Sequence, residues 1–286
     1  MNESEIEDIE LELLLQAIFL KYAYDFRAYA RSSLHGRLLH LMSRLKCASF
    51  TALQDVLLHE DEKWAEFLPF LVVPHTELFR DPTQYISLRN QVLPALKHRE
   101  QLNFWVAGCS TGEEVVSLAI LLKEEGLLDR SRIIATDINP VCLDKAALGV
   151  FSRFKALEGI QNYGKAAGTG ELTGYFETSG KDAVRLSPEL LKRVEFRNHN
   201  LATGSAIGQF DFISCRNVLC YFESALQERA LGLFRDSMEN GGTLAIGSME
   251  LLPEAVLGKL FSPLSSQQGL FQCARKMTPY GQDYAP

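Results

Sequence analysis

The run FWVAGCSTGEEVVSLAILLKEE, residues 104–125, contains the change of pattern that decides the fold. It begins as a short β-prone stretch, passes through a Gly/Ser/Thr turn, and continues with helical spacing after Glu113 and Glu114. A loop that leaves a strand and opens a helix directs backbone N–H groups toward a ligand, and its glycines allow close approach. The run therefore predicts a loop that binds a nucleotide-like ligand, with Gly108 in contact with it.

The same loop also fits the GxSxG nucleophile elbow of serine hydrolases. Ser110 would be the nucleophile, and Asp137 and His199 follow in the chain order that such a triad needs. An elbow normally follows several earlier strands and an oxyanion-hole loop, whereas only helical patterns precede this one. Asp137 ends the next β-rich run about 25 residues on, close to the spacing at which a carboxylate binds ribose hydroxyls. This context favours the nucleotide interpretation and leaves the hydrolase as the weaker alternative.

From the strand before this loop onward, β-rich runs alternate with helical patterns. The five runs are NFWVAG (103–108), RIIATDI (132–138), VEFRNHNL (194–201), DFISCRN (211–217) and TLAIGS (243–248). Such alternation predicts an α/β fold with a doubly wound, mostly parallel, Rossmann-like sheet. Residues of about 152–188 interrupt it with Gly-rich stretches, and we expect loops and a small hairpin there as an inserted β-subdomain.

The first part of the chain has a different character. Residues 1–72 are predicted to form an all-helical domain, because apolar positions recur at three- and four-residue spacing. Arg27, Arg31 and His35 recur at every fourth position, with Arg37 nearby, so cationic side chains would cluster on one helical surface. This surface is either a solvated face or a docking site for an acidic helix. Residues 73–100 are expected to be a linker, and residues 101–286 the catalytic domain.

Composition narrows the class of protein. The 286 residues are 47% apolar, enough for one α/β core and a small accessory domain. The net charge of -7 argues against a dedicated nucleic-acid binder. The six cysteines form no CxxC pair and the histidines lack metal-ligand spacing, so we expect no metal site and no disulfide framework. The acidic start and the lack of a long apolar run predict a cytoplasmic protein without membrane insertion, and we expect a monomer.

Several ordered motifs resemble those of the CheR-type chemotaxis protein-glutamate methyltransferases. AGCSTGEEVVSLA resembles the first motif of that family, and HTELFRDPTQY resembles its T-x-F-F-R-D-P segment. Matches continue through IIATDINPVCLDKAALGVF, VEFRNHNL, FDFISCRNVLCYFESALQERAL and NGGTLAIGSMELL, and reach back to YDFRAYARSSLHGRLLHLM. The resemblance covers nearly the whole chain and implies a methyltransferase sheet that binds S-adenosylmethionine across its strand ends, with S-adenosylhomocysteine as product.

The resemblance also assigns roles to single residues. Thr76 and Arg80 would approach the methionine part of the cofactor, Asp137 its ribose, and Asn200 with Leu201 its adenine. The full set of cofactor-binding residues that it implies is Thr76, Arg80, Gly108, Glu113, Asp137, Asn200, Leu201, Arg216 and Asn217. Arg80, whose guanidinium fork matches carboxylate geometry, and Tyr221, beside the transferred methyl group, are the catalytic candidates.

The implied substrate is a glutamate on the cytoplasmic helices of a chemoreceptor, which becomes a methyl ester. Arg27, Arg31 and Arg37 would then dock an acidic receptor helix. The hairpin FETSGKDAVRL is short, so we expect an enzyme that needs no receptor tether peptide. Two alternatives remain open: a non-catalytic regulator that binds S-adenosylmethionine or its product, and a small-molecule methyltransferase on the same fold.

Three departures from the family pattern concern the expected pocket. Pro74 stands where the family has an asparagine, so one polar contact to the cofactor is missing. Leu78 replaces a phenylalanine, and Val115 with Val116 replaces a Pro-Tyr pair. We expect these apolar exchanges to keep the packing.

Overall fold

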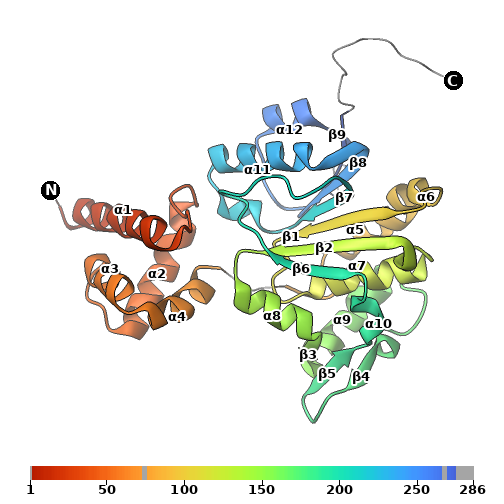
Figure 1. The fold of residues 1–286 in the computed structure, drawn as a ribbon, viewed down its shortest axis with the longest axis horizontal. Coiled ribbons are helices and arrows are strands. Elements are labelled where there is room, and N and C mark those ends of the chain that lie inside the picture. Colours follow the sequence, from red (N-terminus) through yellow and green to blue (C-terminus); the bar gives the residue numbers. More distant parts are fainter. Residues whose placement is uncertain (1, 73–75, 266–268, 275–286) are drawn as a thin grey trace.

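The N-terminal residues form a helical domain, as the sequence predicts. The computed structural model describes residues 2–72, 76–265 and 269–274. The helices of this domain are α1 (Glu3–Tyr22), α2 (Arg31–Leu45), α3 (Phe50–His59) and α4 (Asp61–Leu71). Helix α1 begins with a capping box, because the Asn2 side chain accepts from the Glu5 N–H and the Glu5 carboxylate accepts from the Asn2 N–H. The helices enclose a separate core of leucines and phenylalanines, and the domain lies to one side of the sheet in Figure 1.

One detail of this domain corrects the sequence-based interpretation of its cationic face. Helix α1 ends before Ala23, which is left-handed at φ 61°, and α2 starts only at Arg31. Arg27 therefore lies in the connecting loop. The four-residue spacing of Arg27, Arg31 and His35 does not run along one helix.

A seven-stranded sheet forms the centre of the second domain. Its strands in spatial order are β6 (Val194–Asn198), β2 (Ser131–Asp137), β1 (Leu102–Ala107), β7 (Phe210–Cys215), β8 (Met238–Ile246), β10 (Leu270–Cys273) and β9 (Phe261–Ser265). The first five are parallel and correspond to the five predicted runs, whereas β10 is antiparallel to both neighbours. The order reverses at β1, so the carboxyl ends of β1, β2, β6 and β7 meet at the point where such sheets bind ligands.

Helices cover both faces of the sheet (Figure 1). On one face α7 (Glu113–Glu124) and α8 (Pro140–Leu148) pack on alternate strand residues such as Phe104 and Ile133. On the other, α11 (Ser224–Asp236) and α12 (Glu254–Leu260) pack on the intervening residues such as Trp105. This alternation follows from the two-residue period of a strand.

The expected linker is part of the second domain. Residues 82–96 form α5 (Pro82–Ser87), a π-helical turn η1 (Leu88–Val92) and α6 (Leu93–Leu96). Leu78, Phe79 and Tyr85 are buried against the sheet and α7. Their apolar side chains explain the difference, because a segment that buries several large side chains folds with the core.

The insertion contains more regular structure than expected. A three-stranded sheet of β3 (Val150–Ser152), β5 (Ala183–Leu186) and β4 (Phe176–Thr178) includes the expected hairpin. Between β3 and β4 lie α9 (Arg153–Lys165) and the short turn η3 (Leu172–Tyr175), and α10 (Pro188–Leu191) follows. Helix α9 escaped prediction because its glycines suggested loops.

The two domains meet through a short stretch of extended backbone. Tyr29 forms an antiparallel bridge with Phe222. The Ala30 N–H donates to the Tyr221 carbonyl at 2.8 Å, and the Glu223 N–H donates to the Ala28 carbonyl at 2.9 Å. These bonds hold the loop between α1 and α2 against the segment that follows β7.

Candidate active site

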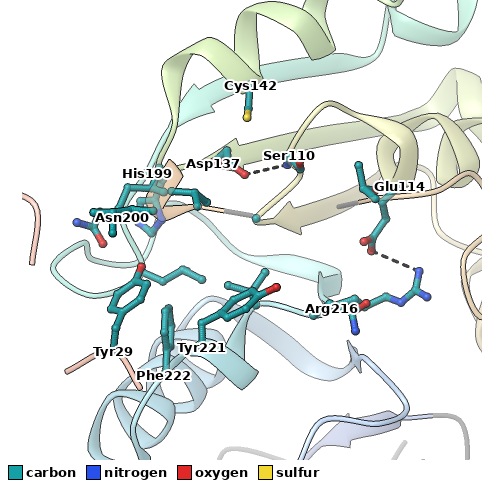
Figure 2. Close-up of a pocket in the computed structure, with 18 of the residues that line it drawn as sticks. Tyr29, Ser110, Glu114, Asp137, Cys142, His199, Asn200, Arg216, Tyr221 and Phe222 are labelled. Carbon is teal, nitrogen blue, oxygen red and sulfur yellow. Dashed lines mark hydrogen bonds and ion pairs between the residues drawn. The ribbon is translucent and has the colours of Figure 1, made fainter. Parts of the chain in front are cut away.

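A pocket lies at the carboxyl ends of β1, β2, β6 and β7, and the helical domain closes one side of it. Figure 2 shows Asp137 and Ser110 on one side, with Tyr29, Tyr221 and Phe222 facing them. The predicted site residues that line the pocket are Thr76, Arg80, Gly108, Asp137, Asn200, Leu201, Arg216, Asn217 and Tyr221, together with Arg37 from the expected docking set. The structure thus gathers residues from Arg37 to Tyr221 of the sequence.

The loop after β1 is fixed by the end of β2. The N–H groups of Gly108 and Cys109 donate to the Thr136 carbonyl at 2.7 and 2.9 Å. The two Asp137 oxygens accept from the N–H groups of Ser110 and Asn139, each at 2.8 Å. Burial raises the pKa of Asp137, and these two N–H groups oppose the rise by favouring the carboxylate. A carboxylate held in this way keeps further lone pairs for hydroxyl donors in the pocket.

Glycine is required at the start of this loop. Gly108 has φ 75°, and a Cβ at this position would lie 2.4 Å from Cγ2 of Val218. Both the backbone conformation and the close approach of the next loop exclude a side chain. The loop therefore presents its backbone to the pocket.

Of the two glutamates that open α7, Glu114 lines the pocket and Glu113 does not. The Glu113 carboxylate pairs with Lys155 of the insertion and accepts from the Thr111 hydroxyl at 2.6 Å. Glu114 accepts from the Ser214 hydroxyl and lies 3.9 Å from the Arg216 guanidinium. Neighbouring residues point about 100° apart on a helix, so only one of the pair can face the pocket. The sequence marks both and cannot choose between them.

Arg216 connects β7 to the expected linker segment. Its guanidinium donates to the Arg80 carbonyl and to Asp81, the latter at 3.0 Å, and lies 3.3 Å from the Tyr85 hydroxyl. The side chain is buried, and its Nε has no hydrogen-bond partner within the described residues. This donor is therefore left to a water molecule or to a polar ligand.

Arg80 and Tyr221 line another part of the pocket, and Cys220, next to Tyr221 in the chain, lies near Arg80. Burial raises the pKa of Tyr221 and that of Cys220, the latter to about 11, while the nearby Arg80 charge lowers both. Arg37 places its guanidinium 5.0 Å from the centre of the Tyr221 ring, within cation–π distance. Two cationic groups thus border the pocket around one tyrosine.

The helical domain contributes Tyr29, Leu71 and Val72 in addition to Arg37. The Tyr29 and Phe222 rings meet edge to face, with centroids 4.9 Å apart. These residues, with Glu114, Cys142 and Phe222, were not recognised from the sequence as pocket residues. Tyr29, Glu114, Cys142 and Phe222 lie within the quoted motifs, but a motif does not show which of its side chains face the pocket, because that depends on how the helices and the two domains pack.

The three arginines of the expected docking surface are not side by side in one cluster. Arg27 pairs with Asp25 at 2.8 Å, and Arg31 lies 4.0 Å from Glu12. Both are exposed on the helical domain and border a shallow groove along α1, whereas Arg37 lines the main pocket.

The geometry disfavours the hydrolase alternative. The Ser110 N–H donates to Asp137, and His199 Nε2 donates to the Ser205 carbonyl at 3.0 Å. In the described part of the chain no hydrogen bond joins Ser110 to His199, and Asp137 does not orient the imidazole. A serine triad requires both contacts.

Pro74, the departure expected to affect the cofactor contact, lies outside the described residues. Leu78, Val115 and Val116 are almost fully buried, as expected for apolar exchanges. Within residues 2–72, 76–265 and 269–274, no cluster of His, Cys, Asp and Glu could hold a metal ion. None of the described helices combines the length and the apolar character that crossing a bilayer requires.

Comparison with known proteins matches both domains. The family model described as "CheR methyltransferase, SAM binding domain" matches residues 74–268, and "CheR methyltransferase, all-alpha domain" matches residues 9–72. A candidate methyltransferase of Pseudomonas putida named Cher3 is 42% identical over 95% of this chain and 99% of its own length. A chemotaxis protein methyltransferase of Listeria innocua is 30% identical over 86% of this chain and 92% of its own. An uncharacterised 104.1 kDa protein of Rhodobacter capsulatus is 28% identical over 92% of this chain, which spans only 27% of that relative.

Proposed function

The chain belongs to the CheR methyltransferase family, and on this premise we propose that it transfers the methyl group of S-adenosylmethionine to glutamate side chains on the cytoplasmic helices of a chemoreceptor. The coarser part, an S-adenosylmethionine-dependent methyltransferase of chemotaxis, rests on the family model and on the named relatives. The glutamate, the receptor and the cytoplasmic location are the proposal. The observation that carries it is a pocket with a carboxylate and a glycine loop on one wall and two arginines on the other.

The residues of the pocket fit an adenosyl ligand. Asp137 offers oxygen acceptors to ribose hydroxyls, Asn200 and Leu201 border the space expected for adenine, and Gly108 leaves room beside the loop. The unpartnered Nε of buried Arg216 can donate to a polar part of the ligand. When bound, S-adenosylmethionine supplies a methyl group activated on a sulfonium.

A glutamate substrate suits the opposite wall. Its side chain has a pKa of about 4.3 in water, so it is an anion at neutral pH and needs no general base. Arg80 and Arg37, which both lie near Tyr221, can attract and orient this carboxylate. One carboxylate oxygen would form the bond to the methyl carbon while the bond from that carbon to sulfur breaks, so that S-adenosylhomocysteine leaves with the electron pair and no proton is transferred. Alignment is then the main contribution of the protein, worth up to about 7 to 11 kcal/mol in well-oriented reactions.

The part of the pocket lined by Tyr29, Arg37, Leu71 and Val72, here called the helical wall, favours this proposal over the small-molecule alternative. Tyr29 and Arg37 come from a domain that packs through backbone hydrogen bonds against the segment beside the pocket. A large accessory domain at the entrance suits a protein substrate, which needs contact area beyond the reacting side chain.

The test is transfer of a radiolabelled methyl group from S-adenosylmethionine to the purified cytoplasmic fragment of a chemoreceptor from the same genome. We expect label on the receptor that mild base releases as methanol, because glutamate methyl esters are base-labile. Replacing the labelled glutamates by alanine in the receptor provides the matched control. Cofactor binding without transfer would favour the regulator, and base-stable label would exclude a glutamate ester.

A further inference from the structure

The loop that follows β8 exposes two large apolar side chains. Met249 is 86% exposed and Leu251 is 89% exposed. Among the described large apolar side chains the next most exposed is Leu20, at 73%. Met249 and Leu251 flank Glu250. Large apolar side chains held this far into solvent at one place commonly mark a contact with another molecule.

The carboxylate between them holds the loop in this arrangement. Glu250 accepts from the N–H groups of Asn217, Cys220 and Gly247 at 2.8, 3.0 and 2.8 Å. Burial raises the pKa of Glu250, and the three N–H groups oppose that rise. Glu250 thus points inward, while Met249 and Leu251 on either side of it are exposed. The three hydrogen bonds of its carboxylate hold the backbone of the loop in this arrangement.

The same bonds place the loop beside the pocket. Asn217 lines the pocket, Cys220 is exposed, and Tyr221 follows it as another lining residue. A Cβ on Gly247 would lie 3.0 Å from the side-chain nitrogen Nδ2 of Asn217, so the two loops are in close contact. The loop that carries Met249 and Leu251 is therefore held against the segment whose residues Asn217 and Tyr221 line the pocket.

We propose that Met249 and Leu251 form an apolar contact for the protein substrate, and that this contact selects an apolar side chain three or four residues from the target glutamate on the same face of a helix. The inference rests on the proposed function, because it takes a helical receptor segment as the partner. Residues three and four apart lie side by side on a helix, so one face presents both the carboxylate and its apolar neighbour. The pocket supplies charge for the first, and the loop supplies apolar surface for the second.

The experiment measures both methylation and binding of the chemoreceptor cytoplasmic fragment with the full chain, using the double variant Met249→Ser, Leu251→Ser. We expect about tenfold rises in the KM for the receptor and in the Kd of its complex with the S-adenosylhomocysteine-loaded protein. The reason is that the apolar area of Met249 and Leu251 that the receptor would bury on binding is removed. The kcat and the affinity for S-adenosylhomocysteine should stay within about twofold of the unmodified protein. Leu148→Ser is the matched control, because Leu148 is also an exposed apolar side chain, at 63%. It is the last residue of α8, whereas the pocket is lined by Cys142 near the first turn of that helix.

Three results would overturn the proposal: unchanged receptor KM and Kd, an equal effect of Leu148→Ser, or a change in sedimentation showing that the loop contacts a second copy of the chain. The two ideas fail in different ways. If the unmodified protein binds the receptor without methylating it, the proposed function fails and receptor binding still judges the loop. If it neither binds nor methylates the receptor, both fail.

Discussion

The two walls of the pocket are held in place by different kinds of contact. On the strand-end wall, Asp137 and Gly108 are fixed by backbone hydrogen bonds between neighbouring loops. On the helical wall, Tyr29 and Arg37 are placed by ring packing, by a cation–π contact and by the docking of one domain on the other. The first wall is formed by residues at the carboxyl ends of neighbouring strands of one sheet, and the second exists only when the two domains pack together.

This difference separates two tasks. The strand-end wall matches a constant ligand, since every turnover uses the same adenosyl group. The helical wall borders the space where the variable partner enters, and its residues can change without disturbing the sheet. Substitutions on the two walls should therefore affect different kinetic constants.

The largest effect is expected from Asp137→Ala on the strand-end wall. It removes the acceptor proposed for the ribose hydroxyls and the partner of the Ser110 and Asn139 N–H groups. We expect affinity for S-adenosylhomocysteine to fall about 100-fold, equivalent to about 3 kcal/mol. Isothermal titration calorimetry measures this. Glu195→Ala, which removes an exposed carboxylate from the adjacent strand β6, should leave the affinity unchanged; equal losses would remove the special role of Asp137.

Gly108→Ala tests how strictly the backbone defines the same wall. The new Cβ would meet Val218 in a left-handed backbone conformation, and we expect about 2 to 4 kcal/mol lower free energy of unfolding. Gly126→Ala is the control, because Gly126 has φ 68° with no atom near its Cβ position, and it should cost only about 1 to 2 kcal/mol. Urea denaturation compares the two. Similar losses would mean that the contact between the loops contributes little.

Arg37→Ala tests the helical wall. It removes a cation from the pocket while Asp137 and the glycine loop remain, so we expect the KM for the receptor to rise about tenfold with cofactor affinity within about twofold. Arg44→Ala is a close control, because Arg44 lies on the same helix with its guanidinium 4.9 Å from the Phe70 ring. Steady-state kinetics at varied receptor concentration distinguishes them. If only the KM for the cofactor rose, Arg37 would bind the cofactor and not the receptor, which would contradict this prediction.

The smallest effect is a pH dependence of cofactor affinity. Burial raises the pKa of Asp137 in the ligand-free protein, and hydroxyl donors from a bound ribose would favour the ionised form and lower it. The affinity for the cofactor is then highest at a pH above the pKa of Asp137 in the ligand-free protein, and it falls as the pH drops through that pKa. We expect a loss of a few-fold between pH 7 and the ordinary range of aspartate, and none in Asp137→Asn. An affinity that increases toward acid would contradict this sign.

The strand-end wall could be predicted from sequence to a large extent, and the helical wall could not. Gly108 and Asp137 stand at the ends of β-rich runs, where parallel-sheet geometry alone brings them together. Glu113 was chosen where Glu114 lines the pocket, because the rotation of α7 depends on its packing. Tyr29 lies in the quoted run YDFRAYARSSLHGRLLHLM, but nothing in that run indicates that this side chain reaches the pocket. Residues 73–100 were expected to be a linker, although Leu78, Phe79 and Tyr85 within that range are part of the core.

The most direct test is a two-substrate kinetic comparison of the unmodified chain, Asp137→Asn, Arg37→Ala and the double variant, with S-adenosylmethionine and the receptor fragment varied independently. The account predicts that Asp137→Asn raises only the KM for S-adenosylmethionine, that Arg37→Ala raises only the KM for the receptor, and that the two effects add in free energy in the double variant. If both substitutions raised the same constant, or if no methyl group reached the receptor, the division of the pocket into a cofactor wall and a substrate wall would be contradicted.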